Sequence, residues 1–297
     1  MLIIFAVFCM SVQEGIFKKF SGEFSLWQIF TLRGILAIPL LLVITRFINL
    51  SQVFANAFKK WVIIRSTAMT LMFVAMYAAI PNLSLSTAAA GIYTAPIFVA
   101  LLSAYGTNET VSVRGWFAIA LGFAGVLVIL KPGTDLFSYW SLLPVLGGFL
   151  YAVSNVITRV HCQSIPPVSL ALSLNFLMLV VGSICSLVVA SIVIDEVTSR
   201  QLAYLTWNWI DMTNSLWSVI IVLSLLVVLI SVSLARAYQV AKPAIVATFD
   251  YSYLVFMAAW DYLFFERPPE ATTILGIAMI IGAGIMAYRS SETANRR

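Results

Sequence analysis

Long runs of apolar residues dominate this sequence, and only short polar breaks separate them. A helix of about 20 consecutive apolar residues crosses the hydrocarbon core of a bilayer. The chain is 62% hydrophobic and 10% charged, whereas soluble domains carry about 25% charged residues. There is too little polar surface to cover a water-exposed globule, so the pattern predicts an all-α membrane protein.

Ten runs are long enough to be transmembrane helices. They are Leu2–Phe20, Leu26–Arg46, Trp61–Ile80, Leu83–Ala104, Arg114–Leu130, Ser141–Val160, Val168–Ile194, Leu216–Ala235, Pro243–Phe265 and Thr272–Tyr288. With ten spans, both ends of the chain lie on the same side of the membrane.

Basic residues predict the orientation, because cytoplasmic loops carry an excess of Lys and Arg. The side that holds both termini has eleven: Arg46, Lys59, Lys60, Arg65, Arg114, Arg159, Arg236, Lys242, Arg289, Arg296 and Arg297. The other side has five: Lys18, Lys19, Lys131, Arg200 and Arg267. We therefore expect both termini in the cytoplasm and the protein in the cytoplasmic (inner) membrane. The same distribution accounts for the net charge of +5 without a nucleic-acid partner.

Two segments of the chain, Thr87–Lys131 and Ala244–Tyr288, resemble each other. Each has a Glu before its last helix, Glu109 and Glu266, and these lie 157 residues apart. At the same offset, Gly125 aligns with Gly282 and Tyr93 aligns with Asp250.

The first and sixth helices also correspond. Glu14 and Lys18 are four residues apart, as are Asn155 and Arg159, which gives an offset of 141. Each half then has five helices, and an odd number means that the second half enters the membrane from the opposite side. Two inverted repeats are typical of transporters, because inversion supplies two exchangeable states.

Four stretches carry a resemblance to a known family: LSLSTAAAGIYTAPIFVALLSA, NETVSVRGWFAIALGFAGVLVILKPG, ARAYQVAKPAIVATFDYSYLVF and FFERPPEATTILGIAMIIGAGIMAYR. They resemble the EamA-type ten-helix members of the drug/metabolite transporter superfamily. The resemblance implies two EamA repeats, at residues 1–133 and 141–290, that form a two-lobed bundle with a central cavity and alternating access. The first helix, with Glu14 and Lys18, and the stretch FDYSYLVF resemble the branch of S-adenosylmethionine and riboflavin transporters.

Charged side chains deep inside predicted spans are the most informative, because burying one costs about 2.5–3.5 kcal/mol on insertion scales. Glu14 and Arg33 flank the first hairpin at similar depth. We expect them to lie within ion-pair reach, either to pin the first helix to the second or as part of a proton or cation site. Lys18 is a competing partner for Glu14, one turn further along the same helix.

Asp250 lies about 12 Å along its helix from Lys242 and has no basic neighbour one turn away. That favours a position facing a central cavity, where the carboxylate would bind a cationic group or exchange protons.

Four further side chains, Tyr93, Tyr151, Asn155 and Tyr251, are polar or amphipathic residues within spans. They line the cavity or, alternatively, are core residues whose polar atoms bond to backbone carbonyls. We expect Asp261, near the end of its run, to lie at the interface, and Pro96 to mark a kink. Close helix packing is the expected role of the glycines Gly122, Gly125, Gly276, Gly282 and Gly284.

The sequence favours a secondary transporter that moves a small organic metabolite, such as an amino acid or a nucleoside- or vitamin-like compound. An enzyme is disfavoured because HExxH and GxSxG motifs are absent. We expect no metal and no cofactor. A channel or a non-transporting membrane scaffold is the alternative. Protons or a counter-substrate are candidate coupling partners, and the sequence leaves a homodimer open.

Overall fold

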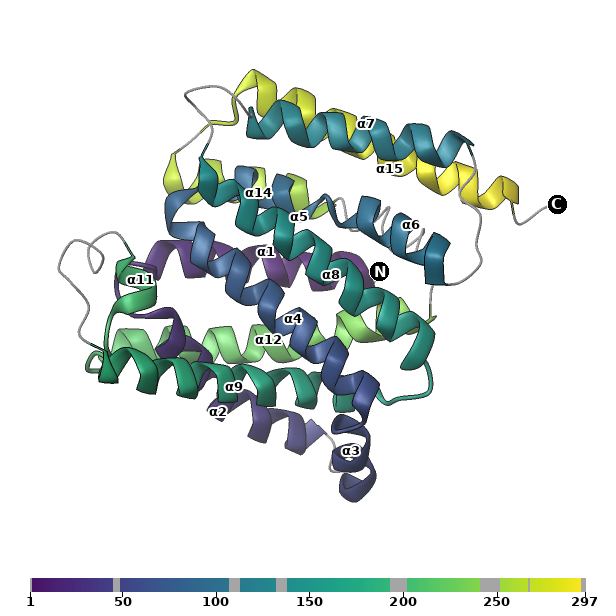
Figure 1. Ribbon diagram of the computed structural model, residues 1–297. Coiled ribbons are helices and arrows are strands. Elements are labelled where there is room, and N and C mark those ends of the chain that lie inside the picture. Colours follow the sequence, from purple (N-terminus) through teal and green to yellow (C-terminus); the bar gives the residue numbers. More distant parts are fainter. Residues whose placement is uncertain are drawn as a thin grey trace.

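The computed structural model describes residues 2–44, 49–106, 113–131, 138–192, 202–240, 252–266 and 268–294. Within these ranges every regular element is helical (Figure 1). The α-helices are α1 (Leu2–Phe20), α2 (Leu26–Ile44), α3 (Leu50–Ala57), α4 (Lys60–Ala79), α5 (Leu85–Ile92), α6 (Ala95–Gly106), α7 (Val113–Leu130), α8 (Leu142–His161), α9 (Pro167–Ser191), α11 (Ala203–Thr206), α12 (Asn214–Val240), α14 (Ser252–Phe265) and α15 (Ala271–Ala294).

Six of the helical segments are long and apolar enough to cross a membrane. They are Leu26–Val43, Lys60–Asn82, Val113–Leu130, Tyr139–His161, Pro167–Ser191 and Asn214–Val240. Shorter apolar helices occupy Leu85–Val99, Ser252–Phe265 and Ala271–Met286. The fold is therefore that of an all-helical membrane protein with at least six candidate spans, and the count of ten stays a prediction.

The fourth predicted span is interrupted. Helix α5 ends at Ile92 and α6 begins at Ala95, with Tyr93 and Thr94 between them. The Thr94 hydroxyl donates to the Gly91 carbonyl, 2.8 Å away, which satisfies one of the carbonyls at the end of α5. Pro96 stands in the first turn of α6, where a residue without an N–H breaks no helical hydrogen bond.

Helices of the first half of the chain pack mainly on helices of the second half. Helix α7 runs along α15, α4 packs on α8, α2 on α9, and α1 on α12 and α14. In Figure 1, α7 and α15 form the layer at one edge of the bundle, and α2 and α9 lie towards the opposite edge. Neither half therefore buries its apolar faces by itself.

Glycines set the closest of these contacts. A Cβ placed on Gly125 would lie 2.8 Å from the carbonyl oxygen of Gly276, and one on Gly276 would lie 2.7 Å from that of Gly125. Close packing is thus confirmed for Gly125 and Gly276. It is wrong for Gly282, where an added Cβ meets nothing within 4 Å, because that residue does not face α7 at the crossing. On the other side of the bundle, Gly34 and Gly182 bring α2 and α9 together in the same way.

The reciprocal contact gives a test of packing. We expect Gly276→Ala to lower the melting temperature of the detergent-purified protein, because the new methyl group would collide with backbone that can move only if the helices separate. Overpacking of this kind costs about 1–3 kcal/mol. Gly282→Ala is the matched control, and its melting temperature should stay unchanged or rise, since Ala is the better helix former. Equal melting temperatures for the two variants would contradict the packing argument.

Candidate functional site

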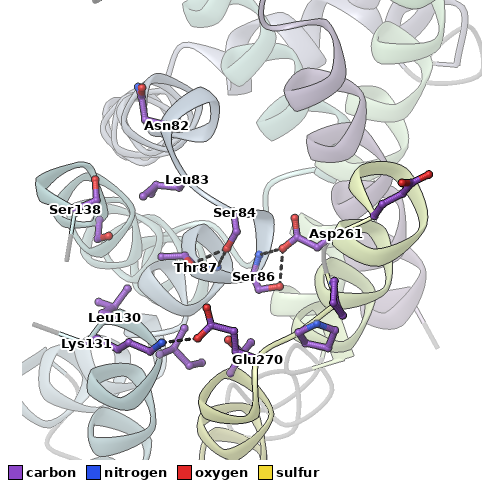
Figure 2. A pocket seen from close by; sticks show the side chains of 16 residues that line it. Asn82, Leu83, Ser84, Ser86, Thr87, Leu130, Lys131, Ser138, Asp261 and Glu270 are labelled. Carbon is purple, nitrogen blue, oxygen red and sulfur yellow. Dashed lines mark hydrogen bonds and ion pairs between the residues drawn. The ribbon is translucent and has the colours of Figure 1, made fainter. Parts of the chain in front are cut away.

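A cavity of about 530 Å³ opens where α5 begins, α7 ends, and α14 is joined to α15 (Figure 2). Polar side chains form much of its wall. Its lining residues are Asn82, Leu83, Ser84, Ser86, Thr87, Ile129, Leu130, Lys131, Ser138, Ser141, Asp261, Glu266, Pro268, Pro269, Glu270 and Thr273. In the orientation that the basic residues predict, this cavity faces away from the cytoplasm.

At the back of the cavity, Asp261 of α14 caps the N-terminus of α5. One carboxylate oxygen accepts from the Leu85 N–H at 3.0 Å, and the other accepts from the N–H and the hydroxyl of Ser86, both at 2.7 Å. The first N–H groups of a helix have no partner within it, and a negative charge there is favourable. Asp261 is only 3% exposed, so the carboxylate is buried between two helices. It lies one turn before the end of α14, and its depth at the membrane interface stays a prediction.

An ion pair between Lys131 and Glu270 crosses the rim of this cavity and joins the end of α7 to the start of α15 (Figure 2). The hydrogen bond from Lys131 lowers the pKa of the Glu270 carboxyl below its ordinary value. Lys131 and Glu266 both have a positive φ, 48° and 51°. Each follows the last residue of its helix, a position where left-handed residues commonly end helices.

Glu14 lies in the interior of the bundle, on α1. It is 1% exposed, and its Oε2 atom has no hydrogen-bond partner. Its neighbour Gln13 donates to the hydroxyl of Tyr77 on α4, at 2.5 Å. A buried carboxyl group with an unsatisfied oxygen is a candidate to bind a proton or a cationic group.

Arg33 of α2 is also 1% exposed. The rings of Phe17, Phe30 and Phe73 surround its guanidinium group, with centroids 5.4, 5.3 and 5.9 Å away. Such cation–π contacts stabilise a desolvated cation. Nη2 donates to the sulfur of Met178 on α9, at 3.2 Å, and Nη1 has no partner.

The expected ion pair between Glu14 and Arg33 is wrong. Among the residues that the structure describes, the only ion pair joins Lys131 and Glu270. Equal depth did not bring the two groups together, because Arg33 points into the ring cluster and towards α9. Arg33 instead contacts the Phe17 ring, which stacks on the Tyr77 ring with 3.8 Å between the ring centroids. Lys18, the alternative partner of Glu14, donates to the Leu83 carbonyl and lies over the Phe265 ring.

The other predicted site residues lie elsewhere. Tyr93 is at the interruption between α5 and α6, and its ring is 5.4 Å from that of Tyr253 on α14. Tyr151 and Asn155 lie on α8, the helix whose Thr158 accepts a hydrogen bond from Arg65 of α4. Asp250 and Tyr251 fall outside the described residues. The described site residues thus occupy three places within the bundle.

Sequence reasoning missed several polar residues in these places. Tyr77, Gln13 and Asp261 have partners 64 to 176 residues away in the chain, and no local motif announces them. Arg65 was counted among residues flanking the membrane, yet it is 1% exposed and lies inside α4. Its position five residues past Lys60 was the available signal.

The model of the EamA-like transporter family matches residues 1–131 and 138–289. The chain belongs to the EamA-like transporter family. It is therefore a membrane protein of a transporter family and not an enzyme.

Curated relatives are distant. A riboflavin transporter of Brucella anthropi is 24% identical over 203 residues, which cover 68% of this chain and 67% of that protein. A pseudopaline exporter of Pseudomonas aeruginosa strain PAO1 is 24% identical over 294 residues, 98% of this chain and 96% of the exporter. An S-adenosylmethionine uptake transporter of Rickettsia felis is 25% identical over 212 residues, 71% of this chain and 66% of that transporter.

A solved crystal structure shares the fold. It superposes with a TM-score of 0.68 at 13% sequence identity and covers 96% of this chain and 95% of its own.

The cap on α5 predicts a localised loss of stability. Asp261→Asn keeps the shape of the side chain, but turns an amide NH2 towards donors, so buried N–H groups lose an acceptor at a cost of about 1–3 kcal/mol. We expect a lower melting temperature and faster hydrogen exchange at Leu85 and Ser86. Glu270→Gln, which breaks the exposed ion pair on the same rim, is the control and should change neither measurement appreciably. Unchanged exchange in Asp261→Asn would show that the cap does not stabilise α5.

Proposed function

We propose that this protein is a secondary transporter that carries a small organic metabolite across the cytoplasmic membrane by alternating access. The observation that carries this proposal is that Glu14 and Arg33 are both buried in the bundle without forming an ion pair with each other. Each has an atom without a partner, although burial of a charge in the membrane is costly. The surrounding groups come from both halves of the chain, since Tyr77 is on α4 and Met178 is on α9. A substrate or a proton would complete their interactions.

The pattern of helix contacts supports two inverted repeats of five spans each, at residues 1–133 and 141–290. If α1 corresponds to α8 and α4 to α12, the packing of α4 on α8 has its counterpart in the packing of α12 on α1. The packing of α5 and α6 on α8 likewise has its counterpart in that of α14 on α1. Helices α2 with α9, and α7 with α15, pair with their own counterparts. Exchange of the halves therefore leaves the main contacts in place, which is what alternating access by inverted repeats requires.

The substrate class rests on the relatives. Their names include riboflavin, S-adenosylmethionine and pseudopaline, and both uptake and export occur among them. We therefore assign the substrate to small organic metabolites, with amino acids and nucleoside- or vitamin-like compounds as the first group to test. A thermal-shift screen of the purified protein against a metabolite library would find it, because a ligand that binds the folded state raises the melting temperature.

Transport in proteoliposomes then distinguishes a carrier from a channel and from a non-transporting scaffold. A carrier gives saturable uptake that a trapped, unlabelled substrate accelerates by exchange. A channel would give uptake that rises in proportion to concentration, and a non-transporting scaffold would give none.

Asp250 remains in the proposed site, together with Tyr251, Tyr93, Tyr151 and Asn155. We expect Asp250→Asn to leave folding and membrane insertion intact while it abolishes transport or removes its pH dependence. The change preserves shape and deletes the charge, so it separates a binding or coupling role from packing. Asp211→Asn is the control, because Asp211 is an exposed carboxyl group in the connection before α12. Wild-type transport with unchanged pH dependence in Asp250→Asn would refute the role.

The proposed topology has ten spans and both termini in the cytoplasm. A cysteine introduced by Arg297→Cys should react with a membrane-impermeant maleimide only after intact cells are permeabilised. A cysteine introduced by Asp211→Cys should react without permeabilisation, since it would lie on the outer side. The wild-type protein, with Cys9, Cys162 and Cys185, supplies the background labelling. Labelling of position 297 from outside would disprove this orientation.

A further inference from the structure

Arg65 is a second guanidinium group buried in the bundle, apart from the cluster around Arg33. It lies on α4, one turn inside the start of that helix, and is 1% exposed. Its Nε atom donates to the Thr158 hydroxyl oxygen on α8, 3.0 Å away. Its Nη1 atom has no partner. The group is therefore held in place at one nitrogen and left with an unused donor at another.

Two further polar groups without hydrogen-bond partners lie on α8 within one turn of Thr158. The Thr158 hydroxyl donates to the Ser154 carbonyl at 2.8 Å, so its hydrogen is already used. The amide nitrogen of Asn155 and the hydroxyl of Ser154 have no partners. Tyr151, which is also buried, stands one turn before Asn155 on the same face of α8. A guanidinium and an amide NH2 group without acceptors are suited to an anion.

Among the residues that the structure describes, the helices that pack around Arg65 carry no acidic side chain. Helix α4 packs on α8 and α9, and α8 also contacts α12. Residues 49–106, 138–192 and 214–240, which supply these helices, contain neither Asp nor Glu. The same end of the bundle carries further basic side chains: Lys59, Lys60, Arg159, His161 and Arg236. The positive-inside rule explains cations at the surface. A buried guanidinium group, however, is stable only with a counter-ion.

We propose that Arg65 and Asn155 form an oxyanion-binding site that takes the carboxylate or phosphate group of the transported solute at the end of the bundle where α4 begins. The assignment to a transported solute rests on the proposed function, whereas the oxyanion site stands on its own geometry. Guanidinium groups match the shape of carboxylates and phosphates, and charge-assisted hydrogen bonds to them are short and strong. Nη1 of Arg65 and the amide of Asn155 are the two donors that the anion would satisfy.

A stacked pair of rings lies one turn from Arg65 along α4 and one turn from Thr158 along α8. Trp61 precedes Arg65 by one turn of α4, and His161 follows Thr158 by one turn of α8. The two rings are 3.9 Å apart and nearly parallel, with an angle of 4° between their planes. The rings therefore form a contact between α4 and α8 one turn nearer the helix ends than Arg65.

The test uses the full-length, detergent-purified protein and three salts at matched ionic strength: sodium chloride, sodium acetate and sodium phosphate. We expect acetate or phosphate to raise the melting temperature of the wild type by several degrees relative to chloride. Arg65→Gln should abolish this rise. It should also leave the melting temperature in chloride unchanged or higher, because a buried charge without a counter-ion has been removed. Lys59→Gln deletes an exposed cation at the same end of α4 and should keep the full rise.

Several results would overturn the proposal. One is a rise in melting temperature that the Arg65→Gln variant retains. The absence of any rise for the wild type in acetate and phosphate would count equally. Another is a clear loss of stability in Arg65→Gln in chloride, since that would mean that Arg65 already has a counter-ion and acts structurally. If Arg65→Gln does not fold, Arg65→Lys decides, because it keeps the charge and loses the planar donor set: a smaller rise supports the site and an equal rise overturns it.

Transport measurements distinguish an oxyanion that belongs to the transported solute from free phosphate. Once a substrate is known, phosphate on the side where α4 begins should slow its transport by competition. Acceleration would instead assign the site to free phosphate as an exchange partner and overturn its assignment to the solute. If no solute is transported at all while the Arg65-dependent rise persists, the proposed function fails and the oxyanion site stands.

Discussion

Within the hydrocarbon core of a membrane there is no water to satisfy a polar group, so each buried donor or acceptor must find its partner in the protein. Most of this bundle obeys that constraint. The interruption between α5 and α6 is satisfied by the Thr94 hydroxyl, and the start of α5 is satisfied by a carboxylate from a distant helix. The exceptions include uncharged groups such as those of Thr70, Ser169 and Tyr253, and the three charged groups Glu14, Arg33 and Arg65. Because each unsatisfied group is costly, these three places are where a solute, a proton or an anion has the most to contribute.

The two halves of the chain depend on each other for burial. The pairings of α7 with α15 and of α2 with α9 are close because glycines on the facing helices leave room for backbone. A half taken alone would expose these faces. The same arrangement places the polar clusters between helices from different halves, so a relative movement of the halves necessarily changes the surroundings of Arg33 and Arg65.

The sequence was sufficient for the elements and insufficient for their contacts. Apolar runs located the first span at Leu2–Phe20, which coincides with α1, and placed the third within one residue of α4. The fourth span was predicted as one helix, because hydropathy does not report a break that a neighbouring helix stabilises. At that break, Gly148 of α8 lies so close that an added Cβ would be 2.5 Å from the Thr94 hydroxyl oxygen.

The predicted contacts between side chains were wrong for a related reason. Position along a helix gives the depth of a side chain, as for Glu14 and Arg33, but the direction in which it points also depends on how the helices are rotated. Likewise, the repeat aligned Gly125 with Gly282, whereas contact across an antiparallel pair depends on where the helices cross, which selects Gly276. Asp261 could not be assigned because its partners lie 175 and 176 residues away.

The cap that Asp261 places on α5 has a mechanical consequence for the cavity beside it. Helix α14 cannot be pulled straight away from α5 without stripping the acceptor from two backbone N–H groups in a buried place. The contact between α5 and α14 is therefore costly to break. The exposed ion pair between Lys131 and Glu270 can break at little cost, because water solvates both charged groups. Widening of the cavity is therefore expected to proceed by rotation about the α5–α14 contact, with α7 and α15 parting at their ends first.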